Sequence, residues 1–456
     1  MLRILGLTML LGVSARQLQA QTASSDVDAF YIRKIYDRAL TTGACYDWLG
    51  YLTQHIGARL AGSPQAAAAV NYTHWVLDTL GLDTVWLQPC MVNHWVRGDK
   101  EVVRIVNSPA LGSLDLHALS LGNAVGTGPD GLTAEVVEVQ GLDDLEKLGR
   151  SKLEGKIVFF NRPFDPTQIN TFAAYGGAVD QRGSGAARAA RFGAVAVLVR
   201  SMTTRLDDVP HTGSLAYEAG TRPIPAVAIS TNDAEMLSWA LKKNPTSVYL
   251  RTTCQMLEKV PSFSVIGEIR GTEHPEDIIL VGGHLDSWDV GQGAHDDGAG
   301  CVQSMEVLRL LRQLGYKPSR TLRCVLFMNE ENGLAGGRAY WEASNAAKEF
   351  HLAAIESDRG GFTPRGFTFE ADAMMRARAM VRTKSIGSIF STFSSGVPGM
   401  AINMLIGTLS GCSSRLASVT SMPTRSSAPS PMPMIPPEQT LMPAWRTRAS
   451  VSRRSA

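Results

Sequence analysis

Three predominantly apolar runs stand out in the second half of the chain, at residues 277–283, 321–328 and 352–355. Runs of this length without polar alternation are typical of strands in a sheet that is covered on both faces. Between the first two runs, apolar residues recur at the spacing of a helix: Val302, Met305, Leu308 and Leu311. An alanine-rich helix is predicted over 337–350, before the third run. The pattern therefore predicts successive strand–helix units and an α/β fold.

The middle of the chain, which we place at residues 111–255, has a pattern of its own. Short apolar strands alternate there with helices and frequent glycines, at residues 156–160, 185–191, 194–199, 224–230 and 232–242. This spacing predicts a separate, compact α/β module. The module has no sequence cluster of cysteine, histidine and carboxylate side chains, so we expect the chemistry to lie elsewhere.

The first twenty residues, 1–20, are typical of a secretory signal peptide. Arg3 supplies a positive start, residues 4–13 form an apolar run, and Leu-Gln-Ala precedes the expected cleavage. The run is too short to span a bilayer, and no later part of the sequence predicts a membrane span. We therefore expect a secreted or extracytoplasmic protein, in the periplasm or, in a eukaryote, in the secretory pathway or lysosome. The alternative for residues 1–20 is a buried N-terminal helix.

Composition supports a sizeable core, but charge is uneven along the chain. Apolar residues make up 44% of the 456 residues, and the formal net charge is +2. Of the 44 basic and 42 acidic residues, ten and two lie in residues 371–456, which leaves 34 and 40 for residues 1–370. The near-balance argues against nucleic acid as a partner. The basic tail (residues 371–456) is rich in Ser, Arg, Met and Pro and is not expected to form a folded domain.

Acidic and histidine side chains follow each of the three predicted strands. His284 and Asp286 come after the first strand, Glu330 and Glu331 after the second, and Asp358 after the third. The carboxyl ends of neighbouring strands are where open α/β sheets bind ligands. Burying so many carboxylates costs several kcal/mol per ion, in order of magnitude, unless a cation offsets the cost.

A divalent cation therefore accounts for the cluster. Imidazole and carboxylate ligands without thiolate suit zinc in a hydrolytic site. Asp296 in Asp-Asp-Gly adds a further acid, and five first-shell candidates are available in all, which suggests two metals that share a bridging ligand. Taken singly, Asp-Asp-Gly and Glu-Glu-Asn-Gly are also typical of turns or helix caps, but their combination at successive strand ends favours a metal site.

These motifs resemble the di-zinc, co-catalytic exopeptidases of the aminopeptidase and carboxypeptidase Q (plasma glutamate carboxypeptidase) type. The matching words are Gly283-His284-Leu285-Asp286-Ser287, Gly293-Ala294-His295-Asp296-Asp297-Gly298, Asn329-Glu330-Glu331-Asn332-Gly333 and Glu356-Ser357-Asp358. The resemblance implies an α/β fold with a mixed, mostly parallel sheet sandwiched by helices. The catalytic domain would comprise residues 21–110 and 256–370, with a smaller α/β protease-associated domain inserted at 111–255.

The resemblance also implies a role for each side chain. His284 and Asp358 would hold one zinc ion, Asp296 would bridge two zinc ions, and Glu331 would hold the second. Glu330 would be the general base.

Two further acids would act through their neighbours. Asp286, which is assigned with Glu330 to the catalytic residues, would fix the tautomer and orientation of His284. Asp297 would shape the backbone of the bridging Asp296.

The sequence departs from the family pattern in one respect. The family has a further histidine ligand late in the chain, on the second zinc, whereas the last histidine here is His351. The composition changes at about the same place, after Phe369-Glu370. Our hypothesis is a frameshift near residues 370–375, and the alternative is a naturally diverged tail. The second zinc site would then be incomplete, and activity of this chain low or absent.

The resulting functional hypothesis is a secreted zinc-dependent exopeptidase that hydrolyses dipeptides or short peptides. An aminopeptidase of the same architecture has the same motifs, because specificity depends on how the substrate termini are held. A non-catalytic binding protein on the same scaffold is the alternative from another class. The resemblance also implies a homodimer.

Overall fold

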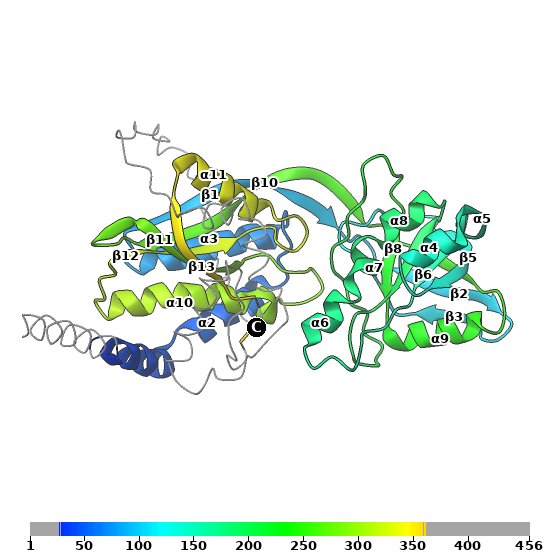
Figure 1. Cartoon of the computed structure of the whole chain (residues 1–456), viewed down its shortest axis with the longest axis horizontal. Helices are drawn as coiled ribbons and strands as arrows, with labels where there is room; N and C mark the ends of the chain where they lie inside the picture. The colour runs from blue at the N-terminus through cyan, green and yellow to red at the C-terminus, as the bar shows by residue number, and fades with distance from the viewer. Residues whose placement is uncertain (1–26, 28, 359, 362–456) are drawn as a thin grey trace, which may run out of the picture.

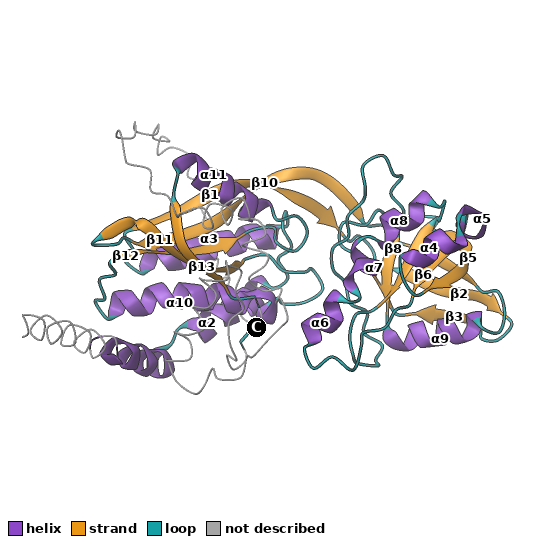
Figure 2. Cartoon of the chain, in the orientation of Figure 1, coloured by secondary structure: helices purple, strands orange, loops and turns teal. Residues whose placement is uncertain are grey.

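The computed structural model describes residues 27, 29–358 and 360–361 of the chain. The expected signal peptide, the basic tail and the proposed frameshift region lie outside the described residues. Two sheets, each covered by helices, make up the described part (Figures 1 and 2). We call the part built on the first sheet the first unit, and residues 97–254, which form the second sheet, the second unit.

The first sheet has the strand order β1-β10-β12-β11-β13. Its strands are β1 (Thr84–Val96), β10 (Gln255–Ile269), β11 (His274–His284), β12 (Arg320–Phe327) and β13 (Phe350–Glu356). β11 pairs in parallel with β12 and with β13, whereas β10 pairs antiparallel with β1 and with β12. The three apolar runs of the sequence are confirmed as β11, β12 and β13. Because these three strands are parallel, their carboxyl ends meet at one edge of the sheet.

Helices cover both faces of the first sheet. On one face, α2 (Cys45–Gly50), the π-helical turn η1 (Tyr51–Ile56), α3 (Pro64–Thr79) and α10 (Ala299–Gln313) share a hydrophobic core with the strands. On the other face, α11 (Ala335–Ala347) packs through Tyr340 against β11 and β12. A further helix covers residues 29–42. The sandwich expected from the sequence is confirmed, with a sheet that is mixed in direction.

The second sheet has the strand order β3-β2-β9-β5-β6-β7-β8-β4. Its strands are β2 (Val102–Ser108), β3 (Gly112–Leu116), β4 (Ala118–Ser120), β5 (Leu132–Val139), β6 (Ile157–Phe160), β7 (Ala196–Arg200), β8 (Ala226–Ile229) and β9 (Ser247–Arg251). The central strands β5 to β8 are parallel. β2 already belongs to this sheet, so the second sheet starts before residue 111, where the module was placed from sequence.

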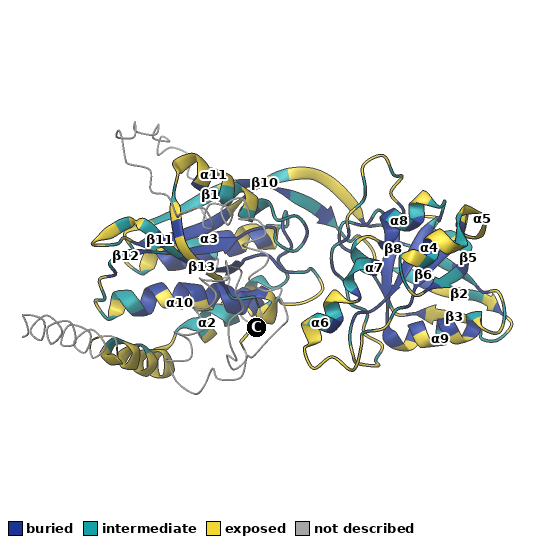
Figure 3. Cartoon of the chain, viewed as in Figure 1, coloured by how far each residue is buried: buried dark blue, intermediate teal, exposed yellow. Residues whose placement is uncertain are grey.

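Each face of the second sheet has its own hydrophobic core. One core includes α8 (Gly185–Arg191), and the other includes α9 (Thr231–Leu241). Short helices complete the unit: α4 (Asp143–Leu148), α5 (Arg150–Leu153), α6 (Thr171–Gly176) and α7 (Val179–Gly183). Figure 3 shows that the central strands of both sheets are buried while the outer helix faces are exposed.

The two units are joined by β1 and β10, which pair with each other from Thr84–Glu268 to Val96–Gln255 (Figure 1). Side chains also cross between the units. Trp95 Nε1 donates a hydrogen bond to the Ala124 carbonyl over 2.9 Å. Among the described helices, none is both long and apolar enough to cross a bilayer.

Candidate metal centre

The candidate side chains come together at the carboxyl ends of the three parallel strands. His284 is the last residue of β11, Glu330 and Glu331 follow β12, and Asp358 follows β13. Asp296 lies in the short turn η2 (Ala294–Gly298), which connects β11 to α10. Strand order therefore brings five residues from distant parts of the sequence to one place.

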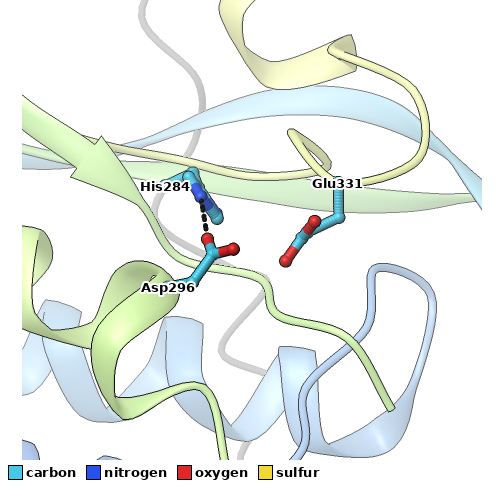
Figure 4. Close-up of side chains that lie close together, drawn as sticks. All are labelled: His284, Asp296 and Glu331. Atoms are coloured by element: carbon cyan, nitrogen blue, oxygen red, sulfur yellow. Dashed lines mark ion pairs between the residues drawn. The ribbon is translucent and has the colours of Figure 1, made fainter. Parts of the chain in front are cut away.

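His284 lies at the centre of the cluster. Its Nε2 atom is 2.9 Å from Asp296 Oδ1 and 3.3 Å from Asp358 Oδ1. Ligand atoms of His284, Asp296 and Glu331 all lie within 4.8 Å of one another. Figure 4 shows the imidazole of His284 directly above the Asp296 carboxylate, and the Glu331 carboxylate pointing toward both. An imidazole and carboxylates thus face a common point.

Asp297 lies close to the cluster but faces the backbone. One carboxylate oxygen accepts a hydrogen bond from the His284 main-chain N–H over 3.0 Å, and the other from that of Gly300 over 2.9 Å. Asp297 also forms a group with His284 and Asp358 whose ligand atoms lie within 4.8 Å of one another. Since both of its oxygens are engaged, Asp297 ties the end of β11 to the start of α10.

Asp286 joins two parts of the site. Its main-chain carbonyl lies 3.0 Å from His284 Nδ1, while its carboxylate is 4.0 Å from the same atom. The carboxylate instead accepts hydrogen bonds from the main-chain N–H groups of Glu330 and Glu331, over 2.9 and 3.3 Å. The contact that orients His284 therefore comes from the Asp286 main chain, and the Asp286 side chain fixes the loop after β12.

Burial perturbs the acids of the cluster. It raises the pKa of Glu330 to about 8, where the negative charges of Asp286 and Asp358 add to the shift. Burial, reinforced by the charge of Asp296, also raises the pKa of Glu331 well above its usual range. The shared cause is that several carboxylates occupy a site with little solvent.

His284 has the opposite balance. Burial works against its charged form, but hydrogen bonds to Asp296 and Asp358 raise its pKa well above the usual value. Without a cation, the imidazole is therefore protonated, and its positive charge pairs with the neighbouring carboxylates. A metal ion requires the neutral imidazole, so metal and proton compete for Nε2.

The residues present fit a divalent cation. Buried oxygens of Glu330 and Glu331 have no hydrogen-bond partner among the described residues. Unpaired buried carboxylate oxygens are costly and call for a partner. Because the ligand groups combine imidazole with carboxylates, the donor set suits zinc.

Sequence reasoning missed Arg59, which is fully buried beside the metal cluster. Its guanidinium donates hydrogen bonds to three main-chain carbonyls of the segment that follows β11. The available signal was a single arginine in a largely apolar stretch, Ile56 to Ala61. That signal does not show which backbone groups the side chain meets.

Comparison with known proteins gives consistent results. The sequence profile of peptidase family M28 matches residues 264–395, and thus extends past residue 371. Carboxypeptidase Q from Mus musculus is 35% identical over 372 residues, covering 78% of this chain and 76% of the relative. Carboxypeptidase Q from Homo sapiens is 38% identical, covering 73% and 68%.

Solved structures agree in fold. The peptidase M28 precursor from Shewanella amazonensis SB2B has a TM-score of 0.75 and 32% identity, covering 84% of this chain and 86% of the other. A zinc aminopeptidase from Bacillus subtilis, at 20% identity and a TM-score of 0.57, covers 80% and 81% and supports the fold alone. This chain belongs to peptidase family M28, because it shares more than 30% identity with these relatives over most of their length and matches the family profile.

Proposed function

We propose that this protein is a zinc exopeptidase that hydrolyses dipeptides or short peptides. The observation on which this rests is the convergence of His284, Asp296, Glu331 and Asp358 beside the buried Glu330. Relatives that bear the name carboxypeptidase Q support cleavage at the carboxyl end. An aminopeptidase of the same architecture remains the near alternative, since both activities need the same metal chemistry.

The proposed ligands fall into two groups around Asp296. His284, Asp296 and Asp358 would hold one zinc ion, and Asp296 and Glu331 would hold a second. When bound, zinc lowers the pKa of water from about 15.7 toward about 7 and polarises the peptide carbonyl. Both effects serve attack by water on the peptide bond.

Glu330 has the properties of a general base. It lies beside the ligand Glu331 but has a buried oxygen with no partner among the described residues. With its pKa raised to about 8 in the metal-free site, Glu330 is mostly protonated at neutral pH, and the positive charge of bound zinc would lower this pKa so that the carboxylate can accept a proton. Glu330 would take a proton from the attacking water and give it to the leaving amine. Asp286 would hold Glu330 in place through the main-chain hydrogen bond described above.

The second zinc position would be the weaker one in this chain. The last histidine, His351, lies at the start of β13, whereas Asp358 follows the other end of that strand. His351 Nε2 is 2.7 Å from the hydroxyl of Tyr340, so its contacts also lie away from the cluster. Without a late histidine, the second ion would rely on carboxylates. We therefore propose reduced zinc affinity there and low turnover.

Zinc content and hydrolysis together test this function. The full chain is expressed with zinc, and the metal per chain is measured alongside hydrolysis of a dipeptide panel. We expect between one and two zinc ions and weak hydrolysis that chelation abolishes. Cleavage of N-acetylated but not C-amidated peptides supports a carboxypeptidase, and the reverse result an aminopeptidase. Absence of bound zinc and of hydrolysis contradicts the proposal and favours the non-catalytic binding protein.

The remaining expectations concern location and assembly. We propose an extracytoplasmic or lysosomal location and a homodimer, both from family resemblance. A fractionation experiment with the full-length chain, followed by light scattering of the purified protein, tests them.

A further inference from the structure

We propose that Arg59 is a positioning residue that holds the ligand loop (residues 285–298) in the shape needed for metal binding. This inference rests on the proposed function, because it concerns the ligands of the same zinc site. It goes further in assigning a role to a side chain that neither lies in the metal cluster nor faces solvent.

The contacts of Arg59 are all with one loop. Nε donates to the Leu285 carbonyl over 2.6 Å, Nη1 to that of Gln292 over 2.9 Å, and Nη2 to that of Gly293 over 2.8 Å. The first acceptor directly follows His284, and the last precedes the turn that contains Asp296. One planar guanidinium thus fixes the distance between both ends of the segment that separates the two ligands.

The main chain of Arg59 adds to this grip. Its N–H donates to Ser287 Oγ over 3.2 Å, and its carbonyl accepts from the Ser287 N–H over 3.4 Å. Gly293 has a positive φ of 59°, and a Cβ atom there would overlap Ser287 Cβ and lie 2.7 Å from Arg59 Nη1. The loop therefore packs closely against Ser287 and the guanidinium, and these contacts together with the positive φ require a glycine.

The charge of Arg59 has no single counter-ion. In the described residues, its guanidinium bonds to main-chain carbonyls and forms no ion pair with a carboxylate, although Arg59 is 0% exposed. Burial lowers the pKa of Arg59, and the nearby acids Asp286, Asp297 and Glu331 counteract that effect. Burying an isolated charge costs free energy of folding. If Arg59 only filled space, an apolar side chain of similar size would give a more stable protein. The cost is offset by three carbonyl dipoles and by the negative charge of the metal site.

A functional consequence follows from this placement. Without the guanidinium, three main-chain carbonyls lose their donors, and the distance between the two ends of the ligand loop is no longer fixed. Asp296 would then no longer be held at His284. Loss of such supporting contacts typically reduces metal affinity about 10-fold to 100-fold.

The experiment compares Arg59→Met, Arg59→Lys and the control Arg205→Met, which removes an arginine whose side chain is 81% exposed. Cobalt(II) is titrated into metal-free protein, with affinity and the visible absorption spectrum as readouts. Arg59→Met should bind cobalt at least tenfold more weakly with an altered spectrum, and added guanidinium chloride should partly restore both. Arg59→Lys should be intermediate, and the control should match the wild type.

Three outcomes separate the possible failures. Wild-type affinity and spectrum in Arg59→Met overturn the role of Arg59 while leaving the zinc site intact. If Arg59→Met does not fold, Arg59→Lys decides, and an unchanged affinity and spectrum in that variant overturn the proposal. A wild-type protein that binds neither cobalt nor zinc overturns the proposed function itself, and with it the proposed role.

Discussion

At the scale of single residues, the sequence predicted which side chains come together better than it predicted their hydrogen bonds. His284, Asp296, Glu331 and Asp358 converge because residue type and strand position could be read from the motifs. The contacts of Asp286 could not be predicted from the motifs. Its carboxylate and its main-chain carbonyl are equally near to His284 in sequence, so the sequence does not show which of the two contacts the imidazole. Arg59 is separated from the loop it holds by more than two hundred residues, a distance that no local pattern bridges.

Glu330→Gln tests the proposed proton transfer. The amide keeps the size of the side chain but cannot accept the proton, so kcat should fall about 10²-fold to 10⁴-fold. Zinc content should remain unchanged, because Glu330 is not a proposed ligand. Glu342→Gln, on the exposed face of α11, is the matched control and should keep full activity. Full activity in Glu330→Gln would mean that another group takes the proton.

His351 gives a prediction about acid stability. Burial lowers its pKa from 6.5 to about 4 in the folded protein. The unfolded chain therefore binds a proton that the folded chain refuses, and stability is lost as pH falls from about 6.5 toward 4. Each unit of pKa difference corresponds to about 1.4 kcal/mol.

The test replaces His351 with glutamine, which can still accept the hydrogen bond from the Tyr340 hydroxyl but does not titrate. Urea unfolding at several pH values should show a smaller loss of stability between pH 6.5 and 4 in His351→Gln than in the wild type. Equal slopes in both proteins would assign the acid sensitivity to other groups.

At the scale of elements, apolar continuity predicted the buried strands and missed the exposed ones. β11, β12 and β13 were predicted within a few residues of their observed ends. β1 and β10 were not, because the first residues of β10 are mostly exposed and stabilised by pairing with β1. Cross-strand pairing between residues far apart in sequence leaves no local hydrophobic signal.

The loop after β12 is held from two elements. The carbonyl of Asn332 accepts hydrogen bonds from Asn93 in β1, over 2.6 Å, and from Asn123 in the second unit, over 3.1 Å. Asn329, with a positive φ of 70°, turns the chain at the start of this loop. The second unit therefore contributes directly to the position of Glu330 and Glu331.

Asn123→Asp should weaken catalysis without removing the left-handed backbone that Asn and Asp both tolerate. A carboxylate facing the Asn332 carbonyl loses the donor and adds repulsion, so kcat/KM should fall about tenfold, equivalent to about 1.4 kcal/mol. Asn170→Asp is the control, because aspartate also caps the start of α6 there. Steady-state kinetics on both variants decide, and equal kcat/KM values would show that the second unit does not position the loop.

At the scale of the whole molecule, the sequence predicted two units but not how they meet. Composition and spacing separate the second unit because each unit buries its own core. The junction depends on individual contacts, such as the paired hydrogen bonds, each 2.7 Å long, from Arg97 to the Asp289 carboxylate. Asp289 belongs to the ligand loop, so this loop is held by Arg59 within the first unit and by Arg97 from the second.

Gly122→Ala tests the junction. A Cβ atom at Gly122 would overlap the indole ring of Trp288 in the ligand loop. Overpacking at this contact should destabilise the protein by about 1–3 kcal/mol, measured as a lower thermal midpoint and a reduced kcat. Gly176→Ala, where a Cβ atom would meet nothing within 4 Å, should leave both unchanged. If the two variants behave alike, Trp288 does not tie the units together.

The paired strands β1 and β10 have a mechanical consequence. Both chain crossings between the units run through this ribbon, whose pairing continues to Val96 and Gln255 (Figure 1). Any movement of the second unit must therefore bend or twist these two hydrogen-bonded strands, which form a stiffer connection than a flexible linker would. The pairing is irregular between Val92 and His94, where the register shifts and the strand is expected to bend. Any movement of one unit relative to the other is thereby coupled to the stiffness of two strands that hold none of the proposed zinc ligands.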